Sequence, residues 1–201
     1  MNFLAHIYLS NGHPKIMIGN FIGDFVKGRN FSELYEPEVA KGIELHRMID
    51  EYTDHHPVVQ QSKAKLRQKY RHYAAVIVDI FYDHFLSKYW NNYHPTPLPV
   101  FASAVYKAIE AHEPILPSAV KGMLPYMVKD NWLVNYGNFH GIGQSLAGIS
   151  RRAQYESKMD ESIDELKDFY EEFKAEFNSF MPDIKREAEN FLKTYFINKV
   201  V

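Results

Sequence analysis

Apolar residues recur at three- and four-residue intervals along most of this chain, which is the spacing of α-helices. The pattern predicts helices from about 37 to 55, from 74 to 93 and from 100 to 112. A further amphipathic helix is predicted from residue 163 onward, ending before Pro182. There is no sustained alternation typical of strands and no repeat of fixed length. The sequence therefore predicts an all-α fold, a single-domain helical bundle over residues 1–201.

Charged residues interrupt the apolar stripe of the first long helix. At 100° per residue, His46, Asp50 and Asp54 occupy the stripe that Val39 and Ile43 should turn toward the core. A buried ionised carboxylate that lacks a partner costs several kcal/mol, so such groups are normally paired or bound to a metal ion. This stripe therefore predicts either a metal-binding site or a buried polar network.

The second predicted long helix, from 74 to 93, also carries charged residues on its apolar side. Asp79, Asp83 and His84 fall within an arc of roughly 140° that also holds Val76 and Ile80. Together with His46 and Asp50, these residues provide two rows of metal ligands. The structural alternative is a network in which the acids accept hydrogen bonds from arginine, tyrosine or backbone groups.

Composition narrows the chemistry. The chain has 201 residues, of which 46% are hydrophobic, enough for one well-packed core. It contains no cysteine, so imidazole and carboxylate are the only strong side-chain ligands, a set that suits Mn²⁺ or Mg²⁺ and also accommodates Fe or Zn. A net charge of −2 gives no general attraction to nucleic acid. No membrane span or signal peptide is apparent, and a cytoplasmic location is expected.

A run of basic residues follows the first charged stripe. On a helix these residues divide between two faces, so a solvated surface is the favoured interpretation. The functional alternative is a docking patch that steers an acidic protein toward the site. The run comprises Lys63, Lys65, Arg67, Lys69 and Arg71.

Several motifs occur together in the first 90 residues. They are Phe3-Leu4-Ala5-His6, Gly19-Asn20, Asp24-Phe25-Val26, His46-Arg47-x-Ile49-Asp50-x-x-Thr53-Asp54 and Asp79-x-x-x-Asp83-His84-Phe85-Leu86. In this order the chain resembles the acyl carrier protein phosphodiesterase family, distant relatives of the HD phosphohydrolases. Weaker matches continue toward residue 152.

The resemblance implies an HD-phosphohydrolase-like, metal-dependent phosphodiesterase that removes 4'-phosphopantetheine from holo acyl carrier protein. It adds Asp24 as a ligand or catalytic group and makes His6 a site candidate. The predicted ligands are Asp24, His46, Asp50, Asp79, Asp83 and His84, and the predicted catalytic residues are Asp24, His6, His84 and Arg47. Arg47 is included because its guanidinium can bind phosphodiester oxygens as a fork.

One feature departs from a standard HD site. The adjacent pair here is Asp83-His84, whereas an HD site has histidine followed by aspartate. Two other functions stay open. One is an HD-like phosphohydrolase acting on a nucleotide or other small phosphoester, and the other is a helical binding protein whose polar cluster is structural.

Overall fold

The computed structural model describes residues 1–199, and the regular secondary structure within that range is entirely helical. The α-helices are α1 (Phe3–Leu9), α2 (Pro14–Ile22), α3 (Phe31–Leu34), α4 (Pro37–His55), α5 (Pro57–Tyr70), α6 (Ala74–Lys88), α7 (Leu98–Ala111), α8 (Ser118–Lys129), α9 (Trp132–Asn135), α10 (Phe139–Ser150), α11 (Ile163–Asp168) and α12 (Tyr170–Lys199). Short 3-10 turns cover Gly23–Phe25, Arg71–Tyr73, Trp90–Asn92, Glu113–Ile115 and Met159–Ser162. The predicted all-α, single-domain fold is confirmed, while the relation to HD phosphohydrolases stays a prediction.

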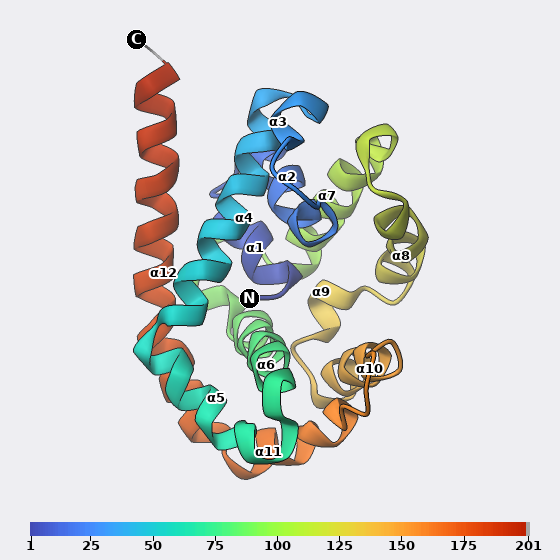
Figure 1. Ribbon diagram of the computed structural model, residues 1–201, viewed down its shortest axis with the longest axis vertical. Coiled ribbons are helices and arrows are strands. Elements are labelled where there is room, and N and C mark those ends of the chain that lie inside the picture. The colour runs from blue at the N-terminus through green and yellow to red at the C-terminus, as the bar shows by residue number, and fades with distance from the viewer. Residues whose placement is uncertain (200–201) are drawn as a thin grey trace.

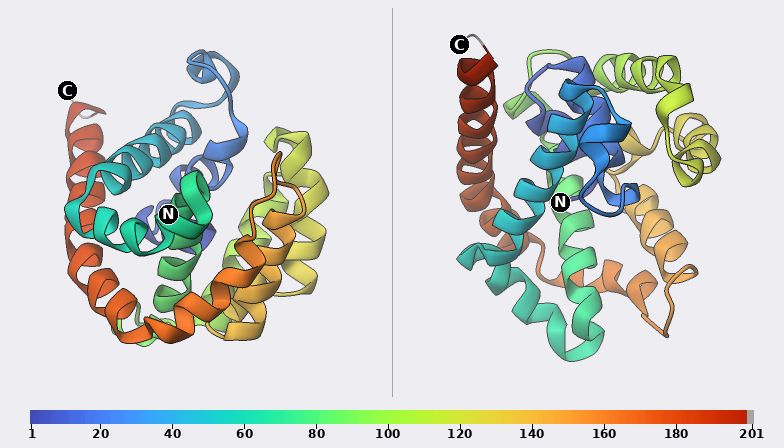
Figure 2. Two further views of the ribbon diagram at one scale, coloured as in Figure 1. Left: turned by 60° about the horizontal axis from the view of Figure 1, so that its bottom comes forward. Right: turned by 45° about the horizontal axis from the view of Figure 1, so that its top comes forward.

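The helices surround α6, which contacts α1, α5, α10 and α12. Figure 1 shows α12 along one side of the molecule and α8, α9 and α10 on the other, with the amino terminus and α6 between them. The two turned views in Figure 2 keep this arrangement. Residues around nearly the whole circumference of α6 are buried, as expected of a central helix. Within residues 1–199, none of the helices combines the length and apolar character that a membrane crossing needs.

Two glycines allow α2 and α4 to pack with their backbones in contact. A Cβ atom added at Gly19 would lie 1.9 Å from the carbonyl oxygen of Val39, and one added at Gly42 would lie 2.1 Å from that of Ile16. Any larger residue at either position would separate the helices. The close approach brings the last turn of α2 against the middle of α4, where the histidine and aspartate of the first charged stripe lie.

The predicted starts of the two long helices agree with the structure. Helix α4 begins at Pro37, as predicted, and α6 begins at Ala74. Helix α6 ends at Lys88 rather than near residue 93, because Trp90–Asn92 form a 3-10 turn.

The prediction of one helix from residue 163 that ends before Pro182 is wrong in both respects. The chain bends at Phe169, between α11 and α12, and α12 then continues through Pro182. Proline cannot donate to the carbonyl of Asn178 four residues earlier, but Asn178 is exposed and water can satisfy that carbonyl. Buried Phe180, Met181 and Ile184 hold the helix in place on both sides of the proline.

Candidate metal centre and pocket

Two histidines and an aspartate converge between α1 and α4. His6 Nε2 lies 3.2 Å from Asp50 Oδ1, and His46 Nε2 lies 3.1 Å from Asp50 Oδ2. The two imidazole rings stack with centroids 4.0 Å apart. One ligand atom from each of the three residues falls within 4.8 Å of the others, which is compatible with a single metal ion. The i, i+4 spacing of His46 and Asp50 on α4 places both on one face of the helix, as the sequence predicted.

Asn20 fixes the orientation of both histidines. Its backbone oxygen lies 2.8 Å from His46 Nδ1, and its side-chain Oδ1 lies 2.8 Å from His6 Nδ1. Its Nδ2 donates to the backbone oxygen of His6 at 2.6 Å and to Ser10 Oγ at 3.0 Å, so Oδ1 is left as the acceptor. Each histidine therefore donates from Nδ1 to Asn20 and turns Nε2 toward Asp50. Asn20 belongs to the Gly19-Asn20 motif, but nothing in its sequence position predicted this role.

Asp24 adds a second carboxylate to the centre. It lies on the 3-10 turn that follows α2, and its Oδ1 is 3.2 Å from His46 Nε2. Its side chain is 64% exposed, more than that of Asp50 at 40%, so it can reach a ligand that approaches from solvent.

The amino terminus lies at the edge of the same centre. The α-amino group of Met1 is buried, 3.0 Å from Asp79 Oδ1 and 3.7 Å from Asp50 Oδ1. The Met1 ammonium thus connects the carboxylate predicted on α6 to the cluster on α4. Asp79 is close to the centre, but it makes no direct contact with either histidine.

The charges of these groups are strongly coupled. Burial would lower the pKa of His46, yet hydrogen bonds to Asp24 and Asp50 raise it to about 9. Burial would raise the pKa of Asp50, but the two histidines hold it well below its usual range. Burial lowers the pKa of His6, and the nearby charge of His46 lowers it further. Burial and the charge of Asp50 raise the pKa of Asp79, although the Met1 amine opposes them.

The surroundings of His6 provide a test of whether a cation fits. Its Nδ1 faces Asn20 Oδ1, and its Nε2 faces both Asp50 Oδ1 and the backbone oxygen of Met1 at 3.1 Å. All three neighbours are hydrogen-bond acceptors, so the ring would have to carry two protons to satisfy them. The lowered pKa of His6 disfavours that charged form. A divalent cation at Nε2, shared with Asp50, resolves the conflict.

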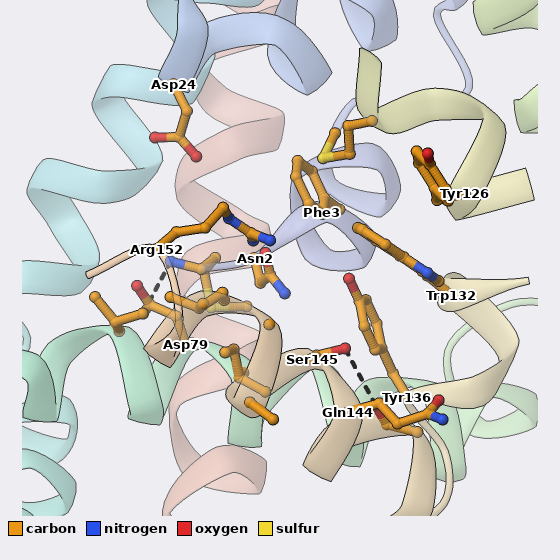
Figure 3. A pocket seen from close by; sticks show the side chains of 18 of the residues that line it. Asn2, Phe3, Asp24, Asp79, Tyr126, Trp132, Tyr136, Gln144, Ser145 and Arg152 are labelled. Atoms are coloured by element: carbon orange, nitrogen blue, oxygen red, sulfur yellow. Dashed lines mark hydrogen bonds and ion pairs between the residues drawn. The ribbon is translucent and has the colours of Figure 1, made fainter. Parts of the chain in front are cut away.

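A large pocket opens from this centre. Its volume is about 1230 Å³. Asp24, Asp50 and Asp79 line one end, and residues of α8, α9 and α10 line the opposite wall. Figure 3 shows Asp24 and Asp79 on one side of the pocket with Arg152 between them, and Tyr126 and Trp132 on the other side.

Asp83, a predicted ligand, lies outside this centre. Its two carboxylate oxygens accept hydrogen bonds from the backbone N–H groups of Leu4 and Ala5, at 2.8 and 3.2 Å. These donors belong to the first turn of α1, where Asn2 provides no side-chain cap. Asp83 therefore caps a neighbouring helix, which explains its burial without a metal ion. Burial raises its pKa to about 7.

His84, predicted as a ligand or acid, also points elsewhere. Its Nδ1 lies 2.7 Å from the backbone oxygen of Tyr136, and its Nε2 lies 3.1 Å from the Tyr170 hydroxyl. Burial lowers the pKa of His84 to about 4. Both ring nitrogens thus have partners within a structural network that joins α6 to α12.

Arg47, predicted to bind phosphodiester oxygens, instead holds a loop. Its guanidinium donates to the backbone oxygens of Val26 and Gly28, at 3.1 and 2.7 Å, and stacks over Phe31. Because this loop follows Asp24 directly, Arg47 stabilises the segment that positions that carboxylate. The structure does not place the guanidinium of Arg47 in the pocket lining.

The predicted basic run lies on α5 except for Arg71, which begins the following 3-10 turn, and three of its members form ion pairs within the chain. Lys63 pairs with Asp54, Lys65 pairs with Glu172 and Glu176, and Lys69 pairs with Glu161 and Glu165. Arg67 and Arg71 have no carboxylate partner among residues 1–199. They line a hollow that shares Asp54 and Ala75 with the large pocket.

Comparison with known proteins gives a consistent result. The family model described as acyl carrier protein phosphodiesterase matches residues 1–184. The acyl carrier protein phosphodiesterase of Photorhabdus laumondii is 35% identical over 191 residues, covering 94% of this chain and 96% of the relative. Those of Serratia proteamaculans and Yersinia enterocolitica are each 30% identical and cover 94% of this chain and 98% of the relative. No solved structure matches the chain significantly.

Proposed function

The chain belongs to the acyl carrier protein phosphodiesterase family, and from this we propose that it hydrolyses the phosphodiester of holo acyl carrier protein. The products would be apo acyl carrier protein and 4'-phosphopantetheine. We further propose that the reaction requires a divalent cation held by His6, His46 and Asp50, with Asp24 as a fourth ligand or as the acceptor of a proton from the attacking water.

The environment of His6 carries the metal part of the proposal. A buried imidazole with a lowered pKa faces acceptors at both ring nitrogens. His46 directs its Nε2 to the same carboxylate. Two imidazoles that Asn20 orients from behind resemble the arrangement in which an outer hydrogen bond fixes a metal-binding histidine.

When bound, a divalent cation would lower the pKa of water and offset charge on the phosphoryl oxygens. The chain's own residues hold the reacting groups in position. Asn20 holds the two rings, Arg47 holds the loop behind Asp24, and Asp24 faces the pocket where a phosphodiester would enter. Water would form the new bond to phosphorus, the bond from phosphorus to the serine oxygen of the carrier protein would break, and the serine oxygen would take up a proton to leave as a hydroxyl.

The donor set favours Mn²⁺ over Mg²⁺. Mg²⁺ prefers oxygen ligands and keeps much of its water, whereas Mn²⁺ accepts imidazole together with carboxylate. Fe or Zn would also suit two histidines and a carboxylate. Asp83, His84 and Arg47 are left out of the proposed catalytic group because their side chains have other partners.

Docking of the carrier protein is proposed for the hollow beside the pocket. Arg67 and Arg71, with neighbouring His55 and His72, line it and face no carboxylate other than Asp54 there. Because Lys65 and Lys69 already pair with glutamates, reversing the charge of Arg67 and Arg71 should raise KM more than reversing that of the lysines. A cytoplasmic location, where carrier proteins of lipid synthesis occur, completes the proposal.

Intact-mass analysis of holo acyl carrier protein tests the function. Incubation with the protein and Mn²⁺ should convert the holo form to the apo form, and chelation should stop the conversion. Asp50→Asn should lower the rate by orders of magnitude. The control is Glu44→Gln, which removes an exposed carboxylate on the same helix. Turnover of small phosphodiesters with holo acyl carrier protein left intact would point instead to a small-molecule phosphohydrolase.

A further inference from the structure

The pocket is larger than the metal centre needs. Ligand pockets usually measure about 300–1,000 Å³, and this one measures about 1230 Å³. It continues from the acidic end to a wall that comes from a different part of the chain, the segment from α8 to the loop after α10. The pocket therefore has room for a ligand larger than the cation.

We propose that Arg152 binds the phosphodiester of the substrate and that the aromatic wall around Tyr126 and Trp132 holds the pantetheine arm. This inference rests on the proposed function, because it assigns the part of the substrate that each side of the pocket contacts. It explains how a long, flexible arm is positioned relative to Asp24.

Beyond the proposed cation and the buried Met1 ammonium, a further positive charge from the chain would favour binding of a phosphodiester at the acidic end of the pocket. Asp24, Asp50 and Asp79 all line it, and together they repel a phosphodiester. Arg47 is unavailable because its guanidinium binds two backbone oxygens. Arg152 lies in the loop after α10, lines the pocket and lies between Asp24 and Asp79 in Figure 3, with its guanidinium toward the centre of the pocket.

The guanidinium of Arg152 is exposed and forms no ion pair with a carboxylate in the part of the chain that the structure describes. A guanidinium presents a planar fork of donors that matches two phosphoryl oxygens. Arg152 is therefore free to bind the phosphodiester while the cluster on α1 and α4 binds the cation.

The opposite wall has the character of a site for an apolar group. Phe3, Met123, Tyr126 and Trp132 come from three helices and line the same side. Tyr126 lines the pocket and is 64% exposed, so its ring is open to a ligand there. Figure 3 shows Phe3, Tyr126 and Trp132 gathered at this end. Such a wall fits the dimethyl group of the pantoyl unit.

Below the aromatic wall, the pocket offers polar groups. Gln144 is exposed and lines the pocket, as does Ser145 on the same helix. Gly148 on that helix leaves space beside Arg152, since an added Cβ would lie 3.6 Å from Arg152 Nη1. The two amides of a pantetheine arm require donors and acceptors of this kind, and an all-apolar lining would leave them unsatisfied.

Calorimetric binding of 4'-phosphopantetheine and of pantetheine separates the two parts of the inference. Arg152→Gln should weaken binding of 4'-phosphopantetheine at least tenfold and leave binding of pantetheine nearly unchanged. Tyr126→Ala should weaken binding of both compounds. Both residues are exposed, so neither change should impair folding. The control is Lys107→Gln, which removes one exposed positive charge on α7, outside the pocket lining.

Activity then distinguishes failure of this inference from failure of the proposed function. If the unmodified protein with Mn²⁺ leaves holo acyl carrier protein intact, the proposed function fails. If it removes the prosthetic group while Arg152→Gln and Tyr126→Ala bind 4'-phosphopantetheine as tightly as Lys107→Gln does, only the inference about the wall is overturned.

Discussion

The imidazole rings of His6 and His46 stack at 17° with centroids 4.0 Å apart, and both turn Nε2 toward Asp50. The two residues lie on different helices, α1 and α4. Asn20 on α2 holds both rings from the opposite side. The centre is therefore a three-helix arrangement whose geometry depends on how α2 packs against its neighbours.

Replacing Asn20 should impair metal binding more than folding. In Asn20→Ala, His6 loses its Nδ1 acceptor while the backbone contact to His46 persists. Loss of such an outer contact typically lowers metal affinity about 10- to 100-fold. Ser10→Ala removes only one other hydrogen bond of Asn20 and should retain affinity. Calorimetric titration with Mn²⁺ checks both, and equal affinities in the two variants would refute the role of Asn20.

The close contact between α2 and α4 should be sensitive to substitution of the glycines that allow it. Gly42→Ala places a methyl group about where the backbone of Ile16 lies, since an added Cβ meets that carbonyl oxygen at 2.1 Å. We expect a loss of about 1–3 kcal/mol in the free energy of unfolding, or more, and weaker Mn²⁺ binding because His46 moves away from Asn20. Gly143→Ala is the control, because a Cβ there meets no atom within 4 Å. Urea unfolding measures the difference.

The metal-free protein should lose stability at alkaline pH through His46. Because the pKa of His46 is raised from 6.5 to about 9, its contribution is fully present below pH about 6.5 and is lost as pH rises through about 9. The melting temperature should therefore fall between pH 7 and 9.5 by more than it does in His46→Gln. Parallel curves for the two proteins would show that the ion pair with Asp24 and Asp50 contributes no such stability.

The same proton should compete with the cation. A ligand must be deprotonated to bind metal, so the apparent affinity for Mn²⁺ should rise about tenfold per pH unit between pH 7 and 8.5 if one proton is displaced from His46. Titrations across this range, in buffers that do not bind Mn²⁺, provide the measurement. An affinity independent of pH would mean that the cation displaces no proton from His46 and that His46 is not a ligand.

Asp83 should behave as a helix cap. Asp83→Asn should keep its Mn²⁺ content and its turnover per folded molecule, in contrast to Asp50→Asn, because the Asp83 carboxylate binds the backbone of α1. Its pKa is raised to about 7, so its contribution is present below the unfolded pKa of about 4 and is lost as pH rises through 7. Relative to Asp83→Asn, the unmodified protein should lose stability between about pH 4 and pH 7. Loss of bound metal in Asp83→Asn would restore Asp83 as a ligand.

The sequence predicted the fold well where the evidence was local. The i, i+4 spacing of His46 and Asp50 placed them correctly on one face of α4, and Pro37 marked the start of that helix. The end at Pro182 was predicted wrongly, because burial of Phe180 and Ile184 outweighs one missing hydrogen bond. Local propensity does not include packing between distant segments.

The site was harder to predict because a buried charged group can be stabilised in more than one way. Asp83 and His84 share the apolar arc of α6, yet one caps α1 and the other bonds to Tyr136 and Tyr170. The roles of Asn20 and Arg152 depend on contacts between residues far apart in the sequence. Neither residue carries a spacing signal, so only the assembled fold shows them facing the cluster and the pocket.

Pulsed EPR of the Mn²⁺-loaded protein tests the central claim, that His6 and His46 hold the catalytic cation. Nitrogen couplings from two imidazoles should appear in the unmodified protein, and His6→Gln and His46→Gln should each remove one. His55→Gln, which replaces an exposed histidine on α4, should keep both couplings. A spectrum without imidazole couplings, or one that neither His6→Gln nor His46→Gln changes, would contradict the claim.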